Sequence, residues 1–168
     1  SELKRAINTL KIILNILNKS EVKINKAWEL NERHYGSLTG LNKNEMKKKL
    51  GEKKVFEFRR SWAGKPESLN RNSPFHPLNI EIYKDVPREN IPDTESLKDC
   101  YERVIPYFKN EILTKLNDNK NILISAHGNS LRAICKYLFD LSETSIVSLE
   151  IVTGSPILLE FEENKLKN

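Results

Sequence analysis

The chain has 168 residues, of which 38% are hydrophobic and 30% charged, and its formal net charge is +5. These proportions suit a soluble globular protein of one domain, and the longest apolar stretch, residues 12–17, is too short to cross a bilayer. Cys100 and Cys135 form neither a CxxC pair nor a zinc spacing, which favours a reducing, cytoplasmic setting. The positive charge favours an acidic partner, either a phosphorylated metabolite or a polyanion.

Helical periodicity marks the start of the chain. Apolar side chains recur every three or four positions over residues 2–18, which predicts an amphipathic helix packed against the rest of the fold. Val22 and Ile24 then alternate with polar residues and suggest a short strand. Residues 27–41 hold no period, which indicates a loop with a functional role.

Capping patterns mark the next helices. Asn42 and Glu45 have the spacing of a capping box, and Gly51 suits a helix end. A second short helix is expected over residues 52–61. Residues 62–94 contain five of the seven prolines and form too long a segment for a simple connection, so they are either a lid over a site or a partly disordered insert.

The second half of the chain predicts alternating helices and strands. A long helix is expected over residues 94–116, with a kink at Pro106. A strand at 121–126 and a helix at 130–139 follow, and residues 146–161 suggest two strands around a turn. Helices that alternate with short apolar strands favour a single α/β domain with a mainly parallel central sheet.

The most informative motif joins the strand at 121–126 to the helix after it. The apolar run ends at His127, Gly128 permits a sharp turn, and Asn129 can cap the helix. Free backbone N–H groups and the helix dipole favour an anion at such a turn. An imidazole placed there can hold or protonate a phosphoryl oxygen.

A second candidate site lies in the aperiodic segment, which combines a carboxylate, cations and a phenol. Glu32 could act as a general acid or base, and the cations could bind a phosphate or a carboxylate. A surface loop with charge pairs is an equally open interpretation of this pattern. The residues concerned are Glu32, Arg33, His34, Tyr35 and Lys43.

Other polar residues give weaker signals. The guanidinium groups of Arg59 and Arg60 suit phosphate, but adjacent residues of a helix diverge, and a solvated pair is the commoner outcome. Arg5 lies on the polar side of the first helix, and His76 lies in the proline-rich segment. Neither residue indicates a site by itself. The lysine run at 47–49 suits a solvated helix face.

Together these segments resemble the cofactor-dependent phosphoglycerate mutases of the histidine phosphatase superfamily. The blocks occur in the family's order and spacing over almost the whole chain. Residues 30–43 are the most specific block, because they separate the mutases from the many phosphatases of the superfamily. The blocks that carry the resemblance are residues 1–6, 30–43, 59–61, 95–99 and 126–132, with residues 153–156 similar to the family's Thr-Gly-x-Pro turn.

The resemblance implies a fold and a reaction. The fold is a three-layer sandwich with a mainly parallel sheet between helices. The reaction is the glycolytic and gluconeogenic interconversion of 3- and 2-phosphoglycerate through a phosphohistidine, primed by 2,3-bisphosphoglycerate and without a metal. The family's enzymes are usually cytoplasmic dimers or tetramers, and neither nucleic acid nor membrane is a partner.

The resemblance also implies residue roles. Glu32 matches the group that takes and returns the substrate hydroxyl proton, and His127 matches the histidine that stabilises the transferring phosphoryl group. Both are implied as catalytic. The implied ligand contacts are Arg5, Glu32, Arg33, His34, Tyr35, Lys43, Arg59, Arg60, Gly128 and Asn129.

The resemblance lacks the family's nucleophile. Its Arg-His-Gly segment would precede Ser1, and its C-terminal tail would follow Asn168, so we expect a chain that is incomplete at both ends. None of the three histidines lies in the nucleophile's context, and the chain alone is therefore expected to form no phosphohistidine. Two alternatives stay open: a non-catalytic anion-binding module of the same fold, and a basic nucleic-acid-binding domain. The absence of interleaved aromatic and basic residues disfavours the second.

Overall fold

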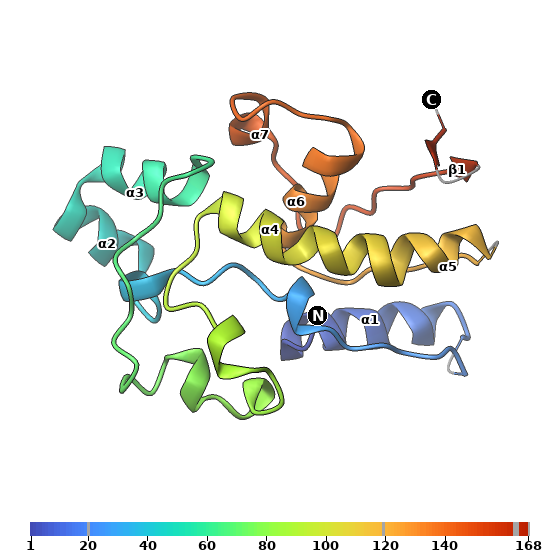
Figure 1. Ribbon diagram of the computed structural model, residues 1–168, viewed down its shortest axis with the longest axis horizontal. Helices are drawn as coiled ribbons and strands as arrows, with labels where there is room; N and C mark the ends of the chain where they lie inside the picture. The colour runs from blue at the N-terminus through green and yellow to red at the C-terminus, as the bar shows by residue number, and fades with distance from the viewer. Residues whose placement is uncertain (20, 119, 163–164, 168) are drawn as a thin grey trace.

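The computed structural model describes residues 1–19, 21–118, 120–162 and 165–167. The elements are mostly helical, with short turns of 3₁₀-helix between them (Figure 1). In chain order they are α1 (Lys4–Ile16), η1 (Trp28–Leu30), η2 (Gly36–Leu38), α2 (Lys43–Leu50), α3 (Glu52–Arg60), η3 (Pro77–Asn79), η4 (Glu81–Tyr83), η5 (Arg88–Asn90), α4 (Leu97–Tyr107), the π-helical η6 (Phe108–Leu113), α5 (Thr114–Asn117), α6 (Gly128–Leu138), α7 (Ser145–Ser148), β1 (Phe161–Glu162) and β2 (Lys165–Leu166).

The main core lies between α4 and α6. Apolar residues of α4 fall on one face of that helix, so Cys100 and Val104 are fully buried, and α6 contributes Ala133 and Ile134. Phe108 extends the cluster beyond the end of α4. Burial of this face fixes the position of the N-terminus of α6, where the histidine turn lies.

The helix predictions are confirmed, with shifted boundaries. The capping box at Asn42 and Glu45 starts α2, and Gly51, with φ of +79°, ends that helix. Helix α4 begins at Leu97 because the Ser96 hydroxyl accepts a hydrogen bond from the backbone N–H of Asp99 at 3.1 Å.

The π-helical η6 begins at Phe108, two residues after Pro106. Proline has no N–H to donate and its ring clashes with the carbonyl one turn earlier. The regular hydrogen-bond ladder is therefore interrupted at the place where the sequence predicts a distortion.

The predicted parallel sheet is not confirmed. Among the described residues the only paired strands are β1 and β2, an antiparallel pair with Phe161 opposite Leu166. The segments at 22–24 and 121–126 form no β-ladder, and Figure 1 shows both as extended chain without strand arrows. Part of the region at 146–161, predicted as two strands, forms α7 instead. An apolar run can indicate a buried extended segment, but a strand also needs a neighbour with which to pair.

The proline-rich segment at 62–94 is held by its own contacts. His76 is fully buried, and its Nδ1 accepts a hydrogen bond from the backbone N–H of Leu78 at 3.1 Å. Its Nε2 therefore carries the proton and donates to Asp93 Oδ1 at 3.0 Å. Tyr83 and Ile91 belong to a small hydrophobic cluster formed mainly within the same segment. These contacts tie parts of the segment to one another, and its role as a lid or excursion stays a prediction.

Arg103 of α4 forms a buried ion pair with Glu95, and both side chains also bond to the backbone of residues 28–34. Arg103 Nε lies 2.7 Å from Glu95 Oε1, and the two side chains are 7% and 3% exposed. The guanidinium also donates to the carbonyls of Trp28 and Glu29, while the other oxygen of Glu95 accepts the N–H of His34 at 2.9 Å. Burial opposes ionisation of Glu95, but Arg103 outweighs it and keeps the pKa of the carboxyl below its ordinary value.

Replacing Arg103 by Met should lower the free energy of unfolding by about 3–5 kcal/mol, because Glu95 is then left buried without its countercharge. Urea denaturation measures the effect. The same substitution at Arg88, which is exposed in η5, is the control and should change stability by less than about 0.5 kcal/mol. Equal effects at the two positions would show that the ion pair does not anchor the fold.

Candidate active site

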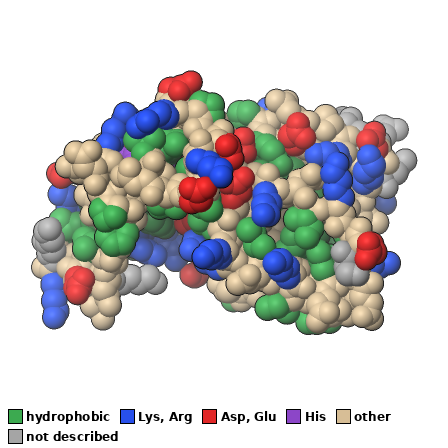
Figure 2. Space-filling view, turned by 90° about the horizontal axis from the view of Figure 1, so that it is seen from below, with side chains coloured by type: hydrophobic (Ala, Val, Ile, Leu, Met, Phe, Trp, Pro, Cys, Tyr) green, Lys and Arg blue, Asp and Glu red, His purple; other side chains and the backbone are tan. Residues whose placement is uncertain are grey.

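A cavity of about 290 Å³ lies where the N-terminus of α6 meets the end of α3 and the segment after η1. Figure 2 shows a hollow between the end of the molecule that α2 and α3 form and the remaining helices, with Lys and Arg side chains in it. Cations outnumber carboxylates in the lining, so the cavity suits an anion. The lining residues are Glu32, Tyr35, Lys47, Val55, Arg59, Arg60, Gly128, Asn129, Arg132, Glu150 and Ile151.

Asn129 connects α6 to the acidic end of the cavity. Its Nδ2 donates to Glu32 Oε1 at 2.9 Å and to the Tyr35 hydroxyl at 3.0 Å. The backbone N–H of Arg33 donates to the same Glu32 oxygen at 2.9 Å. Because His127 is the N-cap of α6, Glu32 and His127 lie at the same end of this helix.

The His127 ring is held in one protonation state. Arg5 Nε, which can only donate, lies 3.2 Å from Nδ1, so Nδ1 accepts. Nε2 then carries the proton and donates to the Ser1 hydroxyl at 2.9 Å. Burial and, next, the charge of Arg5 lower the pKa of His127 to about 4. The imidazole is therefore neutral near pH 7 and is a hydrogen-bond donor.

Two guanidinium groups lie over one aromatic ring. Arg33 is 4.7 Å and Arg59 5.4 Å from the centre of the Tyr35 ring. Arg33 is only 2% exposed and donates to the carbonyl of Phe58 at 2.6 Å. Among the described residues its Nε and one terminal nitrogen have no hydrogen-bond partner. A buried charge left so incompletely satisfied is costly, and an anion nearby would offset that cost.

The structure does not bring every predicted contact to the cavity. The His34 ring packs edge-on against Tyr83, 5.5 Å between centres, and His34 does not line the cavity. Burial lowers the pKa of His34 to about 4. The side chain of Lys43 lies outside the described part of the chain. Arg5, Arg33 and His127 do not line the cavity either, and Arg5 donates to the His127 ring instead.

Sequence reasoning missed several lining residues. Arg132 lies three positions after Asn129 and thus on the same face of α6, a spacing that could have indicated it. The lysine run at 47–49 predicts a solvated helix face, whereas Lys47 lines the cavity. Glu150 comes from the segment after α7, and no local pattern marks it as part of a site.

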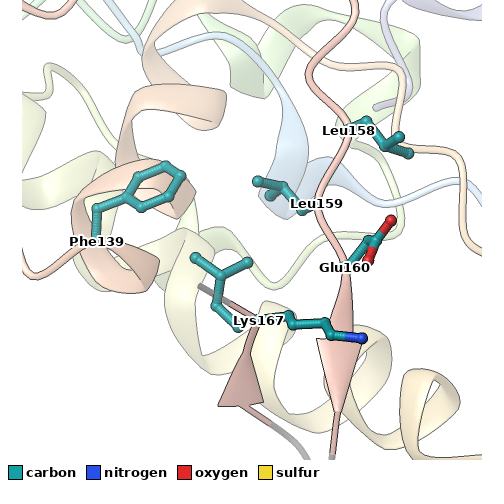
Figure 3. A pocket seen from close by; sticks show the side chains of 6 residues that line it. Phe139, Leu158, Leu159, Glu160 and Lys167 are labelled. Carbon is teal, nitrogen blue, oxygen red and sulfur yellow. The ribbon is translucent and has the colours of Figure 1, made fainter.

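A second hollow of about 360 Å³ lies beside the β1–β2 hairpin. In Figure 3 Leu159 points toward Phe139, whereas Leu158 and Glu160 point to the other side of the chain. Lys167 is the only cation in its lining. This hollow therefore lacks the charges that distinguish the first cavity.

The described residues contain no group of three or more His, Cys, Asp or Glu side chains placed to hold a metal ion. They also contain no helix that is long and apolar enough to span a membrane.

Comparison with known proteins assigns the family. The model of the histidine phosphatase superfamily, branch 1, matches residues 1–74 and 61–167. The chain belongs to this superfamily.

Several of its relatives carry the same name. A protein of Pelagibacter ubique (strain HTCC1062), named 2,3-bisphosphoglycerate-dependent phosphoglycerate mutase, is 61% identical over 96% of this chain and 67% of its own length. Proteins with the same name from Buchnera aphidicola subsp. Cinara cedri and Borreliella afzelii (strain PKo) are 48% and 46% identical, over 96% and 98% of this chain and 70% and 66% of their own lengths. The chain thus spans about two thirds of the length of these relatives.

Replacing Glu150 by Gln should tighten the binding of inorganic phosphate. Glu150 Oε1 lies 3.1 Å from a terminal nitrogen of Arg60, so the carboxylate competes with an incoming anion for that cation. Exposed pairs of this kind contribute about 0.2–1 kcal/mol, which predicts binding tighter by a factor of roughly 1.4 to 5 at low salt.

Isothermal titration calorimetry measures this change, and the control is the same substitution at Glu143, which is exposed and does not line the cavity. Weaker binding by the Glu150 variant would show instead that the carboxylate holds Arg60 in its binding position.

Proposed function

We propose that this chain provides the substrate pocket of a 2,3-bisphosphoglycerate-dependent phosphoglycerate mutase, which interconverts 3- and 2-phosphoglycerate. The observation that carries the proposal is one cavity in which Glu32 faces several cations beside the N-terminus of α6. A phosphorylated carboxylic acid is strongly anionic and fits such a lining. The name shared by the relatives supports the same substrate.

The residue roles follow from the chemistry of phosphoryl transfer. A phosphoryl group passes from a phosphohistidine to a substrate hydroxyl, and the hydroxyl proton passes to Glu32. His127, neutral and donating, stabilises charge on the transferring group together with Arg5. Arg59 and Arg60 bind phosphate or carboxylate oxygens, and the backbone of Gly128 at the helix N-terminus adds a donor. Catalysis here is mainly positioning and charge neutralisation.

The nucleophile comes from outside these residues. None of the three histidines lies in the sequence context of the family's nucleophile, and none of them lines the cavity. A histidine from another segment must therefore carry the phosphoryl group, with 2,3-bisphosphoglycerate as the primer. Cytoplasmic location and assembly into dimers or tetramers remain predictions from the resemblance.

A non-catalytic anion-binding module is the alternative. It would bind phosphoglycerate in the same cavity but would show no turnover. An enolase-coupled assay on the complete gene product, with the primer present, separates the two. Absence of turnover together with retained binding would favour the module.

Replacing Glu32 by Gln in that gene product should lower kcat by a factor on the order of 10², because the variant cannot exchange a proton with the substrate hydroxyl. The control is the same substitution at Glu89, which is exposed in η5 and does not line the cavity. A near-normal rate for the Glu32 variant would mean that another group carries the proton.

We also propose that residues 121–126 form a strand of the mainly parallel sheet when the sheet is complete, within one domain that includes the excursion at 62–94. Among the described residues, no backbone N–H from position 121 to 126 donates a hydrogen bond. Leu123 is 51% exposed, although the residues on either side of it pack against the core. An apolar segment with free donors is prepared to pair with a neighbouring strand.

Hydrogen exchange tests this proposal. In the 168-residue chain the amides of residues 121–126 should exchange quickly, and in the complete gene product they should be strongly protected. The buried helix α4 is the internal control and should be protected in both. Equal, fast exchange at 121–126 in both proteins would contradict a sheet strand there.

A further inference from the structure

Arg132 is a buried cation that the proposed reaction does not use. It is 4% exposed, lies on α6 and lines the cavity. One terminal nitrogen donates to Asn129 Oδ1 at 3.0 Å, and the other donates to the carbonyl of Ile146. Its position under the cavity is therefore fixed from both sides, by α6 and by α7.

The guanidinium determines which way the Asn129 amide faces. An arginine has five N–H donors and no acceptor, so the amide oxygen of Asn129 must point toward Arg132. The NH₂ group then points in the opposite direction, where it donates to Glu32 Oε1 at 2.9 Å and the Tyr35 hydroxyl at 3.0 Å. A flipped amide would place its NH₂ group against the Arg132 donors and its oxygen against the Glu32 carboxylate.

The same direction of hydrogen bonding prepares Tyr35. Its hydroxyl oxygen accepts from Asn129, so the hydroxyl hydrogen is not used in that bond. Among the described residues no acceptor takes this hydrogen, and the residue lines the cavity. An anion in the cavity can receive it.

We propose that Arg132 is a positioning residue, which acts through the Asn129 amide to hold the Glu32 carboxylate and to leave the Tyr35 hydroxyl free to donate to the ligand. This assignment rests on the proposed function for the roles of Glu32 and Tyr35. The direction of the hydrogen bonds rests on the structure alone, and the two parts can be tested separately.

The first test is NMR of the Asn129 side-chain amide, assigned by the loss of its resonances in Asn129→Ser. In the unsubstituted protein the NH₂ protons should show nuclear Overhauser effects to the Tyr35 ring. Effects to the Arg132 guanidinium protons without effects to Tyr35 would place the amide the other way round and overturn the proposal. This measurement needs no variant at Arg132.

The second test compares Arg132→Met with Arg132→Lys. The Met variant has no donor, so the Asn129 NH₂ protons should exchange at least about tenfold faster and kcat should fall by a factor on the order of 10 to 100, with a smaller change in KM. The Lys variant keeps a donor and should recover most of both losses. Ile134→Val, a substitution in the core face of the same helix, controls for lost stability alone and should leave amide exchange and kcat unchanged.

The outcomes distinguish the two proposals. Unchanged Asn129 exchange in Arg132→Met, or equal losses in the Met and Lys variants, overturns the positioning role. If the NMR results hold but the complete gene product shows no turnover, the proposed function fails and the hydrogen-bond direction stands.

Discussion

The buried ion pair of Glu95 and Arg103 is the interaction on which the candidate site depends. Arg103 reaches from α4 to carbonyl groups of η1, and Glu95 holds the backbone N–H of His34. The pair therefore fixes the chain on both sides of Glu32. Two such groups are costly to desolvate, and only their mutual geometry offsets the cost. We therefore interpret the ion pair as fixing the position of the segment around Glu32, and not as a large net contribution to the free energy of unfolding.

The other half of the site depends on the packing of α6. Ala133 and Ile134 pack α6 against α4. Because Arg103 of the ion pair also lies on α4, this packing fixes the N-terminus of α6 relative to the ion pair. At this N-terminus of α6, the His127 ring accepts a hydrogen bond from Arg5, and the Asn129 side chain donates one to Glu32. The packing of α6 and the Glu95–Arg103 pair therefore place the two halves of the site relative to each other, as precise positioning of a ligand requires.

Local chemistry explains what could be predicted from the sequence. The start of α2 at Asn42 and the histidine turn at His127 both depend on neighbours a few residues away. Such local patterns are visible in the sequence. The sheet was not predictable in the same way, because pairing needs a partner that the apolar run at 121–126 does not identify. Similarly, Glu150 enters the cavity through tertiary packing alone, while His34 is removed from it by contacts with the distant Tyr83.

The lining of the cavity brings several positive charges close together. Arg33 and Arg59 share the Tyr35 ring, and Arg33 retains buried N–H groups without partners among the described residues. Burial and, next, the charges of Arg60 and Arg33 hold the pKa of Arg132 below its ordinary value. Only Glu32 and Glu150 oppose them in the lining. A multiply charged anion bound by Arg59, Arg60 and Arg132 would offset the repulsion between these cations, so the charge of the lining favours a ligand of that kind.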